Sequence, residues 1–122
     1  MAGLSEDVLR FIGSSFRSVW ALELLLLLKR ERHVWTRDEL VTAMRASELV
    51  VTNAVDALVA AGLASLEGPG VRYAPVNDHV AGLVEQVEGI YAVRPDAVRR
   101  AIISSTASGA SAFSDAFRLR KD

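Results

Sequence analysis

The segment of residues 36–75 contains polar and basic side chains of the types that contact nucleic acid. The amide of Asn53 matches the donor and acceptor edge of adenine, and the hydroxyls of Ser47 and Thr52 suit phosphate oxygens. Arginines in the same region supply positive charge for the phosphate backbone. The residues predicted in this way to contact double-stranded DNA are Arg37, Arg45, Ser47, Thr52, Asn53 and Arg72.

The expected DNA-contacting helix, which begins after Ser47, contains no Lys or Arg but carries two acids, Glu48 and Asp56. Useful DNA binders neutralise roughly 6–10 phosphates per site, so one copy of the chain falls short and a dimer reaches only the lower end of that range. Further basic residues just before this region are additional candidates for phosphate contact. The alternative is that they interact with the C-terminal end of their own helix and stay solvated. They are Lys29, Arg30, Arg32 and His33. We therefore expect a homodimer with weak or conditional DNA binding.

Two aliphatic residues, Leu49 and Val50, stand where base-contacting polar groups are usual. In a free monomer they would form an exposed apolar patch, and such patches often mark contact surfaces. They are therefore the candidate site for a protein partner. The alternative is that the C-terminal tail of the same chain folds back and covers them.

Local signals predict the elements that position these side chains. Thr36 and Glu39 have the spacing of a capping box, which starts one helix, and Ser47 is suited to cap the next. That second helix is expected to run to about Ala61 and to stop at Gly62, a favoured residue at helix C-termini.

A β-hairpin is predicted directly after these helices. Two short apolar segments between Ala64 and Ala74 flank a Gly-Pro-Gly sequence, which is typical of a tight turn. Leu66, Val71 and Tyr73 are the residues expected to pack the hairpin onto the core.

The N-terminal part predicts a short helix from about Ser5 to Ile12 and a longer one from about Phe16 to Arg30, separated by Gly13-Ser-Ser. The longer helix is apolar on both sides, so the C-terminal region or another subunit must cover its second side. Trp20 is expected to be a core residue of this helix. A membrane span is not expected, because the apolar run Val19–Leu28 is about half the roughly 20 residues needed and contains Glu23.

The C-terminal part predicts a helix from Asn77 or Asp78 to about Val93, another over 96–104, a small-residue connection over 104–112, and a last helix over 112–119. The expected fold is therefore mostly α with a small β-hairpin. Residues 1–94 would form one domain, and residues 95–122 a helical tail that packs on it or on a second subunit. Dimerisation is expected to use the helices that contain residues 19–28 and 80–91.

The order of capped helix, turn, capped helix and hairpin resembles that of winged helix-turn-helix transcriptional regulators. The segment Asn53-Ala-Val-Asp-Ala-Leu-Val-Ala-Ala-Gly-Leu63 resembles the end of the recognition helix in the MarR-like group, and the resemblance covers residues 16–92. It implies a cytoplasmic, dimeric DNA-binding regulator of transcription with additional N- and C-terminal helices. An adaptor of the same fold that binds protein and does not read DNA is the alternative. Some members hold a small ligand between helices, for which Trp20 and Trp35 are candidates.

Composition narrows the remaining function classes. The 122-residue chain has no cysteine and a formal net charge of −1, so thiolate chemistry and a general attraction to phosphate are not expected. His33 and His79 have no metal-ligating residue at a suitable spacing, and the serines at 104 and 105 have no apparent base. We expect no catalytic residue, no metal and no cofactor, and therefore no enzyme.

Overall fold

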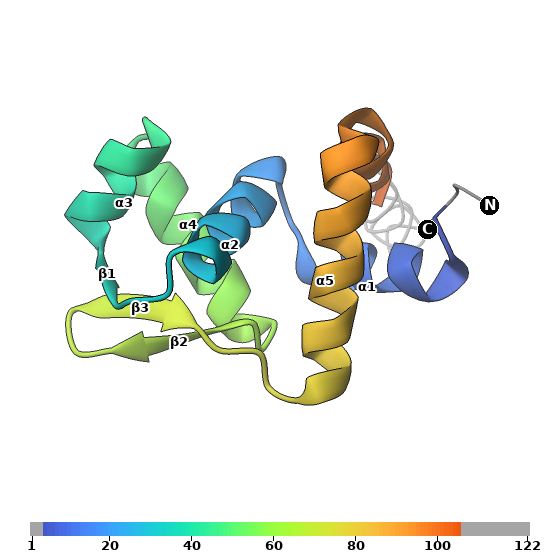
Figure 1. The fold of residues 1–122 in the computed structure, drawn as a ribbon. Helices are drawn as coiled ribbons and strands as arrows, with labels where there is room; N and C mark the ends of the chain where they lie inside the picture. The colour runs from blue at the N-terminus through green and yellow to red at the C-terminus, as the bar shows by residue number, and fades with distance from the viewer. Residues whose placement is uncertain (1–3, 106–122) are drawn as a thin grey trace, which may run out of the picture.

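The structure, a computed structural model, describes residues 4–105. Its elements are α1 (Glu6–Ser15), α2 (Val19–Arg30), β1 (Trp35–Thr36), α3 (Arg37–Met44), α4 (Glu48–Ala60), β2 (Ala64–Glu67), β3 (Gly70–Tyr73), α5 (Asp78–Val93) and a further helical segment at residues 95–105. The described chain is thus mostly helical with a small antiparallel sheet, as expected (Figure 1).

The helix signals around α3 and α4 are confirmed. The Thr36 hydroxyl accepts the Glu39 amide at 3.2 Å, and the Glu39 carboxylate accepts the Thr36 amide at 2.9 Å, which completes the capping box. Ser47 caps α4 by accepting the Val50 amide at 3.1 Å. At its other end, α4 gives way to Gly62, whose φ of 78° suits glycine because it has no Cβ.

The hairpin is also confirmed, but the sheet has an additional strand. Its order is β1-β3-β2, with Trp35 opposite Val71 and Ala64 opposite Tyr73. Strand β1 contains only two residues and lies at the end of the α2–α3 connection, so its apolar pattern is too short to be recognised in the sequence. Gly70 permits its close approach, since a Cβ there would lie 2.6 Å from the Trp35 carbonyl oxygen.

Helix α2 lies at the centre of the molecule and is covered within one chain. It packs on α4 and on β3, and its leucines on both sides are inaccessible to solvent. These are Leu22, Leu24, Leu25, Leu26 and Leu28. Residues 19–28 therefore offer few apolar side chains for the expected dimer surface, because the core of the same chain already covers most of them.

Two residues expected in the core are exposed. Trp20 keeps 43% of its surface accessible and Leu66 keeps 62%. Trp20 lies at the second position of α2, on a side that no element covers completely. Leu66 lies on the edge strand β2, opposite the buried Val71, at the rim of a small surface depression that leaves it exposed. The prediction of core packing was therefore wrong for both, whereas Val71, Tyr73 and Trp35 are buried.

The boundary between the first two helices differs from the predicted one. Helix α1 continues through Gly13 to Ser15, and α2 begins only after Ser18, whose hydroxyl accepts the Ala21 amide at 3.2 Å. Gly13 lies within α1 and does not break it. A Cβ at this position would lie 2.7 Å from the Ser105 hydroxyl oxygen.

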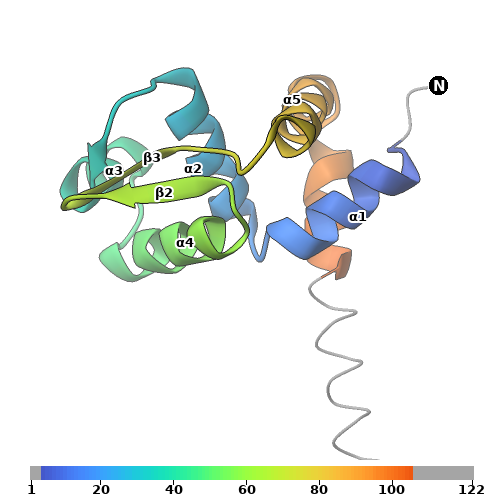
Figure 2. The same ribbon diagram turned by 90° about the horizontal axis from the view of Figure 1, so that it is seen from below.

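A second layer lies across α2 from α3, α4 and the sheet, and consists of α1, α5 and residues 95–105 (Figures 1 and 2). Helix α1 contacts α5, and Val98 and Ile102 are buried in the common core. Residues 95–105 thus pack on the rest of the same chain. The expected connection beyond residue 105 and the expected helix over 112–119 lie outside the described residues.

Polar contacts join this second layer to α2. The Lys29 ammonium lies 2.7 Å from one carboxylate oxygen of Glu88, and the Arg30 guanidinium lies 3.6 Å from the other. The Tyr91 hydroxyl donates a hydrogen bond to Glu23. Burial and this hydrogen bond raise the pKa of Tyr91 above its usual value of 10.0.

Among the described residues, no single helix has the length and apolar character needed to cross a membrane. Helices α1 and α2 meet those criteria only as a pair, and they are bent by 100° at their junction.

Candidate nucleic-acid interface

The turn between α3 and α4 contains the only non-glycine residue with a positive φ among the described residues. Arg45 has φ 54° and ψ 42°, and its amide closes the end of α3 by donating to the Val41 carbonyl. This left-handed conformation redirects the chain within three residues, so that Ser47 can start α4 at once. The side chains of Arg45 and Ser47 are both exposed.

Helix α4 is buried along one side and exposed along the other. Its buried residues are Val51, Ala54, Val55 and Leu58. Leu49, Asn53 and Ala60 are exposed on the other side, and Leu49 keeps 69% of its surface accessible. Helix α4 therefore presents a continuous outer face from its first turn to its last.

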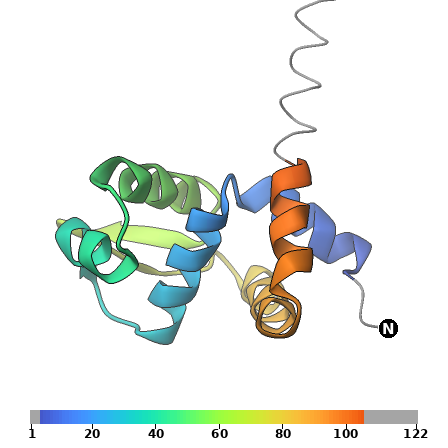
Figure 3. The same ribbon diagram turned by 90° about the horizontal axis from the view of Figure 1, so that it is seen from above.

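The first turn of α4, the whole of α3 and the hairpin turn lie at one end of the molecule, away from α1 and α5 (Figures 2 and 3). Arg37 lines a small surface depression together with Pro69 and Gly70, so the start of α3 is next to the hairpin turn. In that turn, Gly68 has φ 58° and occupies the first central position of a two-residue loop, where glycine is favoured. This end of the molecule combines a helix N-terminus with a projecting hairpin.

The predicted DNA-contacting residues differ in their exposure to solvent and in the polar contacts that they already make. Arg37, Arg45 and Asn53 are exposed, while Thr52 is half-buried. Ser47 uses its oxygen as a helix cap but keeps its own O–H as a donor. The charge of Arg72 is partly offset, because its guanidinium pairs with Glu67 on the neighbouring strand.

The basic residues between α2 and β1 make contacts within the chain. Lys29 and Arg30 pair with Glu88, as described above. Arg32 donates to the Lys29 carbonyl at 2.9 Å and lies 4.9 Å from the centre of the Tyr73 ring. The His33 ring stacks on Trp35 with 4.2 Å between centroids. The side chains of this cluster therefore make contacts within the chain, and fewer of their positive charges are available to bind phosphate.

The electrostatic balance of the candidate interface is close to neutral. Its exposed cations include Arg37 and Arg45, and the acids Asp38, Glu48 and Asp56 are exposed as well. A face of this composition gives little long-range attraction to a polyanion. Any affinity for DNA would therefore depend on short-range contacts.

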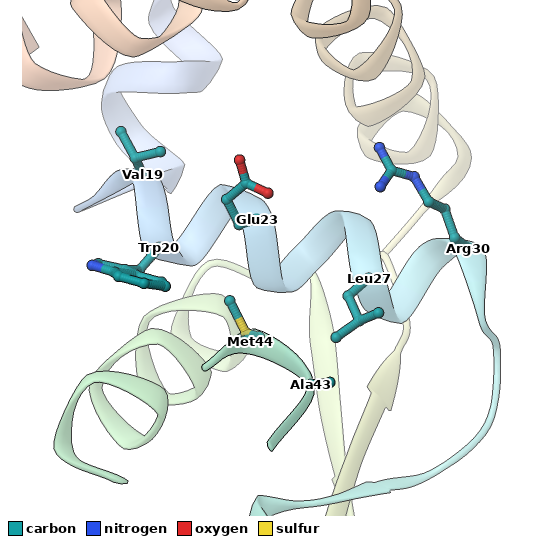
Figure 4. A pocket seen from close by; sticks show the side chains of 7 residues that line it. All are labelled: Val19, Trp20, Glu23, Leu27, Arg30, Ala43 and Met44. Carbon is teal, nitrogen blue, oxygen red and sulfur yellow. The ribbon is translucent and has the colours of Figure 1, made fainter. Parts of the chain in front are cut away.

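Two hollows meet at Trp20, which the sequence did not identify as a surface residue. One, of about 670 Å³, separates the outer face of α4 from the start of α2 and is bordered by Arg17, Trp20, Val50 and Ala57. The other, of about 510 Å³, lies between α2 and the end of α3, where Trp20, Leu27 and Met44 form its apolar wall (Figure 4). Trp35 borders neither of these two hollows.

The part of the chain that the structure describes holds no group of three or more His, Asp or Glu side chains arranged to bind a metal ion. Comparison with protein-family models, with curated proteins and with solved structures gave no match for this chain.

Proposed function

We propose that the protein is a DNA-binding regulator of transcription with a winged helix-turn-helix fold. In this proposal α3 and α4 are the helix-turn-helix, α4 is the recognition helix, and β2 and β3 form the wing. The observation that carries it is the exposed first turn of α4, which lies at the same end of the molecule as the hairpin turn. Asn53 follows on the same exposed face of the helix.

The dimensions and chemistry of this end suit duplex DNA. A single α-helix fits the major groove, and the N-terminal residues of a recognition helix contact the bases. The positive end of the α4 dipole and the Ser47 hydroxyl would face a phosphate. Arg37, beside the hairpin turn, would contact the backbone on the wing side, and Arg45 would contact it between the two helices.

The proposal includes a homodimer, because one copy presents too few cations for stable binding. The surface that it would use is the layer of α1, α5 and residues 95–105, where Leu9, Val93 and Ile103 are exposed. This layer lies away from α4, so two copies joined through it would leave both recognition helices free. A light-scattering mass of two chains is the expected result.

The test is a fluorescence-anisotropy titration of genomic DNA fragments at low and moderate salt. We expect binding at micromolar dimer and a steep loss of affinity as salt rises. Arg37→Gln and Arg45→Gln should each reduce the slope of log affinity against log salt by about 1 per lost phosphate contact. Arg10→Gln, an exposed charge on α1 far from α4, is the matched control: its light-scattering mass should stay that of two chains and its slope should be unchanged. No binding at micromolar dimer and low salt would overturn the proposal.

A second candidate function is an adaptor that holds another protein through the outer face of α4. The observation that favours it is the exposed Leu49 together with the hollow of about 670 Å³ beside α4. Leu49→Asp should then abolish capture of the partner from an extract of the native cell, with an unchanged thermal midpoint. Leu49 is the better position for this test, because Val50 is half-buried and its replacement would also disturb the fold. Capture that survives Leu49→Asp would exclude this face.

A further inference from the structure

The outer face of α4 begins with an aliphatic side chain and continues, one helical turn later, with an amide. Leu49 and Asn53 are four residues apart, so they lie on the same side of the helix, and both are exposed. Leu49 makes so little contact with the rest of the chain that 69% of its surface stays accessible. Leu49 is therefore available for contact with a molecule that approaches the outer face of α4.

In the major groove, these two side-chain types select the same kind of base pair. An Asn amide bonds to adenine through both N6 and N7, and an apolar side chain contacts the 5-methyl group of thymine. Guanine is normally read by Arg or Lys, and α4 contains neither from Glu48 to Ala60. The chemistry of the exposed face thus favours A·T pairs and offers no strong contact to guanine.

The spacing along the helix agrees with the spacing of bases. Four residues of α-helix span about 6 Å, and successive base pairs are about 3.4 Å apart. Leu49 and Asn53 therefore reach base pairs that are adjacent or one step removed. Ala57, the next residue four positions on, has no polar side-chain atom that could hydrogen-bond to a base, so these contacts are confined to the first two turns.

We infer that α4 reads a short run of A·T pairs, with Asn53 contacting adenine and Leu49 contacting a thymine methyl group. This inference rests on the proposed function and deepens it. It gives the exposed leucine a role in DNA recognition, and it names these two side chains as the residues that determine specificity.

The experiment compares two duplexes of about 20 base pairs, long enough for two half-sites one helical turn apart. The two have the same flanks and the same central pairs, and both half-sites consist of A·T pairs in one duplex and of G·C pairs in the other. The full chain is titrated against each by fluorescence anisotropy at low salt. We expect the A·T duplex to bind about tenfold more tightly, which corresponds to about 1.4 kcal/mol. Two modified A·T duplexes then separate the contacts. Deoxyuridine in place of thymidine removes only the methyl group, and 7-deazaadenine removes only N7.

Each modification should weaken binding by the wild-type protein and leave binding by one variant unchanged. Loss of the methyl group should no longer matter in Leu49→Ala, and loss of N7 should no longer matter in Asn53→Ala. Val76→Ala, an exposed apolar truncation between β3 and α5, is the matched control and should respond to both modifications as the wild type does. Both variant sites are exposed, and an unchanged thermal midpoint verifies that the fold is kept.

The outcomes distinguish the inference from the proposed function. Equal binding to the A·T and G·C duplexes, or equal sensitivity of wild type and variants to the modified bases, would overturn the inference and leave DNA binding in place. A preference for A·T that survives both modifications would also overturn it, because groove shape and not base contacts would then explain the selectivity. No binding to any duplex would overturn both.

Discussion

The contact between Glu88 and the end of α2 should hold the two layers of the molecule together. Glu88 lies 2.7 Å from the Lys29 ammonium, and the two side chains are only 25% and 14% exposed. Glu88→Gln preserves the shape of the side chain but leaves the Lys29 charge poorly compensated at a largely buried site. Exposed ion pairs contribute about 0.2–1 kcal/mol, and loss of one partner of a fully buried pair costs about 3–5 kcal/mol. We expect an intermediate loss of about 1–2 kcal/mol.

This loss is measured by urea denaturation and by the thermal midpoint. For a chain of this size, we expect a fall of about 4–8 °C in the midpoint. The matched control is Glu67→Gln, because Glu67 pairs with Arg72 on the hairpin and both side chains are about half exposed. That change should cost about 0.5 kcal/mol or less. Adding Lys29→Met to Glu88→Gln should cost less than the sum of the two single changes, because each removes the same interaction.

The explanation would be refuted if Glu88→Gln cost no more than Glu67→Gln. It would be refuted equally if the double variant were additive. Either result would mean that solvent screens the Lys29–Glu88 pair as it screens the hairpin pair, and that other contacts hold the layers together.

Three further predictions concern the fold. Gly82→Ala should raise the free energy of unfolding by about 0.5–1 kcal/mol, because Gly82 lies inside α5 with open space around it. Gly70→Ala should lower the free energy of unfolding by roughly 1–3 kcal/mol, because the added Cβ would collide with β1. Both are read from urea midpoints. Because the native state raises the pKa of Tyr91, its contribution to stability should be complete below about pH 10 and lost as pH rises through the raised pKa. Tyr91→Phe should remove that part of the alkaline decline in urea midpoints. Acrylamide should quench Trp20 strongly and Trp35 weakly, and Trp20→Phe should remove most of the quenching.

The parts of the fold that follow from local chemistry could be predicted from the sequence. The capping of α3 by Thr36 and of α4 by Ser47 depends on side chains and amides three residues apart, so the sequence contains all the partners. The turn at Gly68 likewise depends on the residues of the turn itself. These local features also located the candidate DNA-binding residues on α3, α4 and the hairpin.

Features that depend on distant partners could not be predicted. A helical wheel shows which sides of α2 are apolar but not which positions are covered, and Trp20 is therefore exposed while the leucines are buried. Strand β1 exists only because it pairs with β3, far along the chain. The Lys29–Glu88 pair likewise joins residues that are far apart in the sequence, and it offsets one of the charges predicted as candidates for phosphate contact. No local pattern reports a contact between residues so far apart in sequence.

The most direct test of the proposed DNA-binding surface is a map of amide chemical-shift changes in the ¹⁵N-labelled full chain on addition of the A·T duplex. We predict that the largest changes fall on residues 45–53, at the turn and the first half of α4, with smaller ones at the hairpin turn, residues 67–70. Amides of α1, α5 and residues 95–105 should change little. Changes confined to that second layer, or no change at saturating duplex, would contradict the assignment of α4 as the recognition helix.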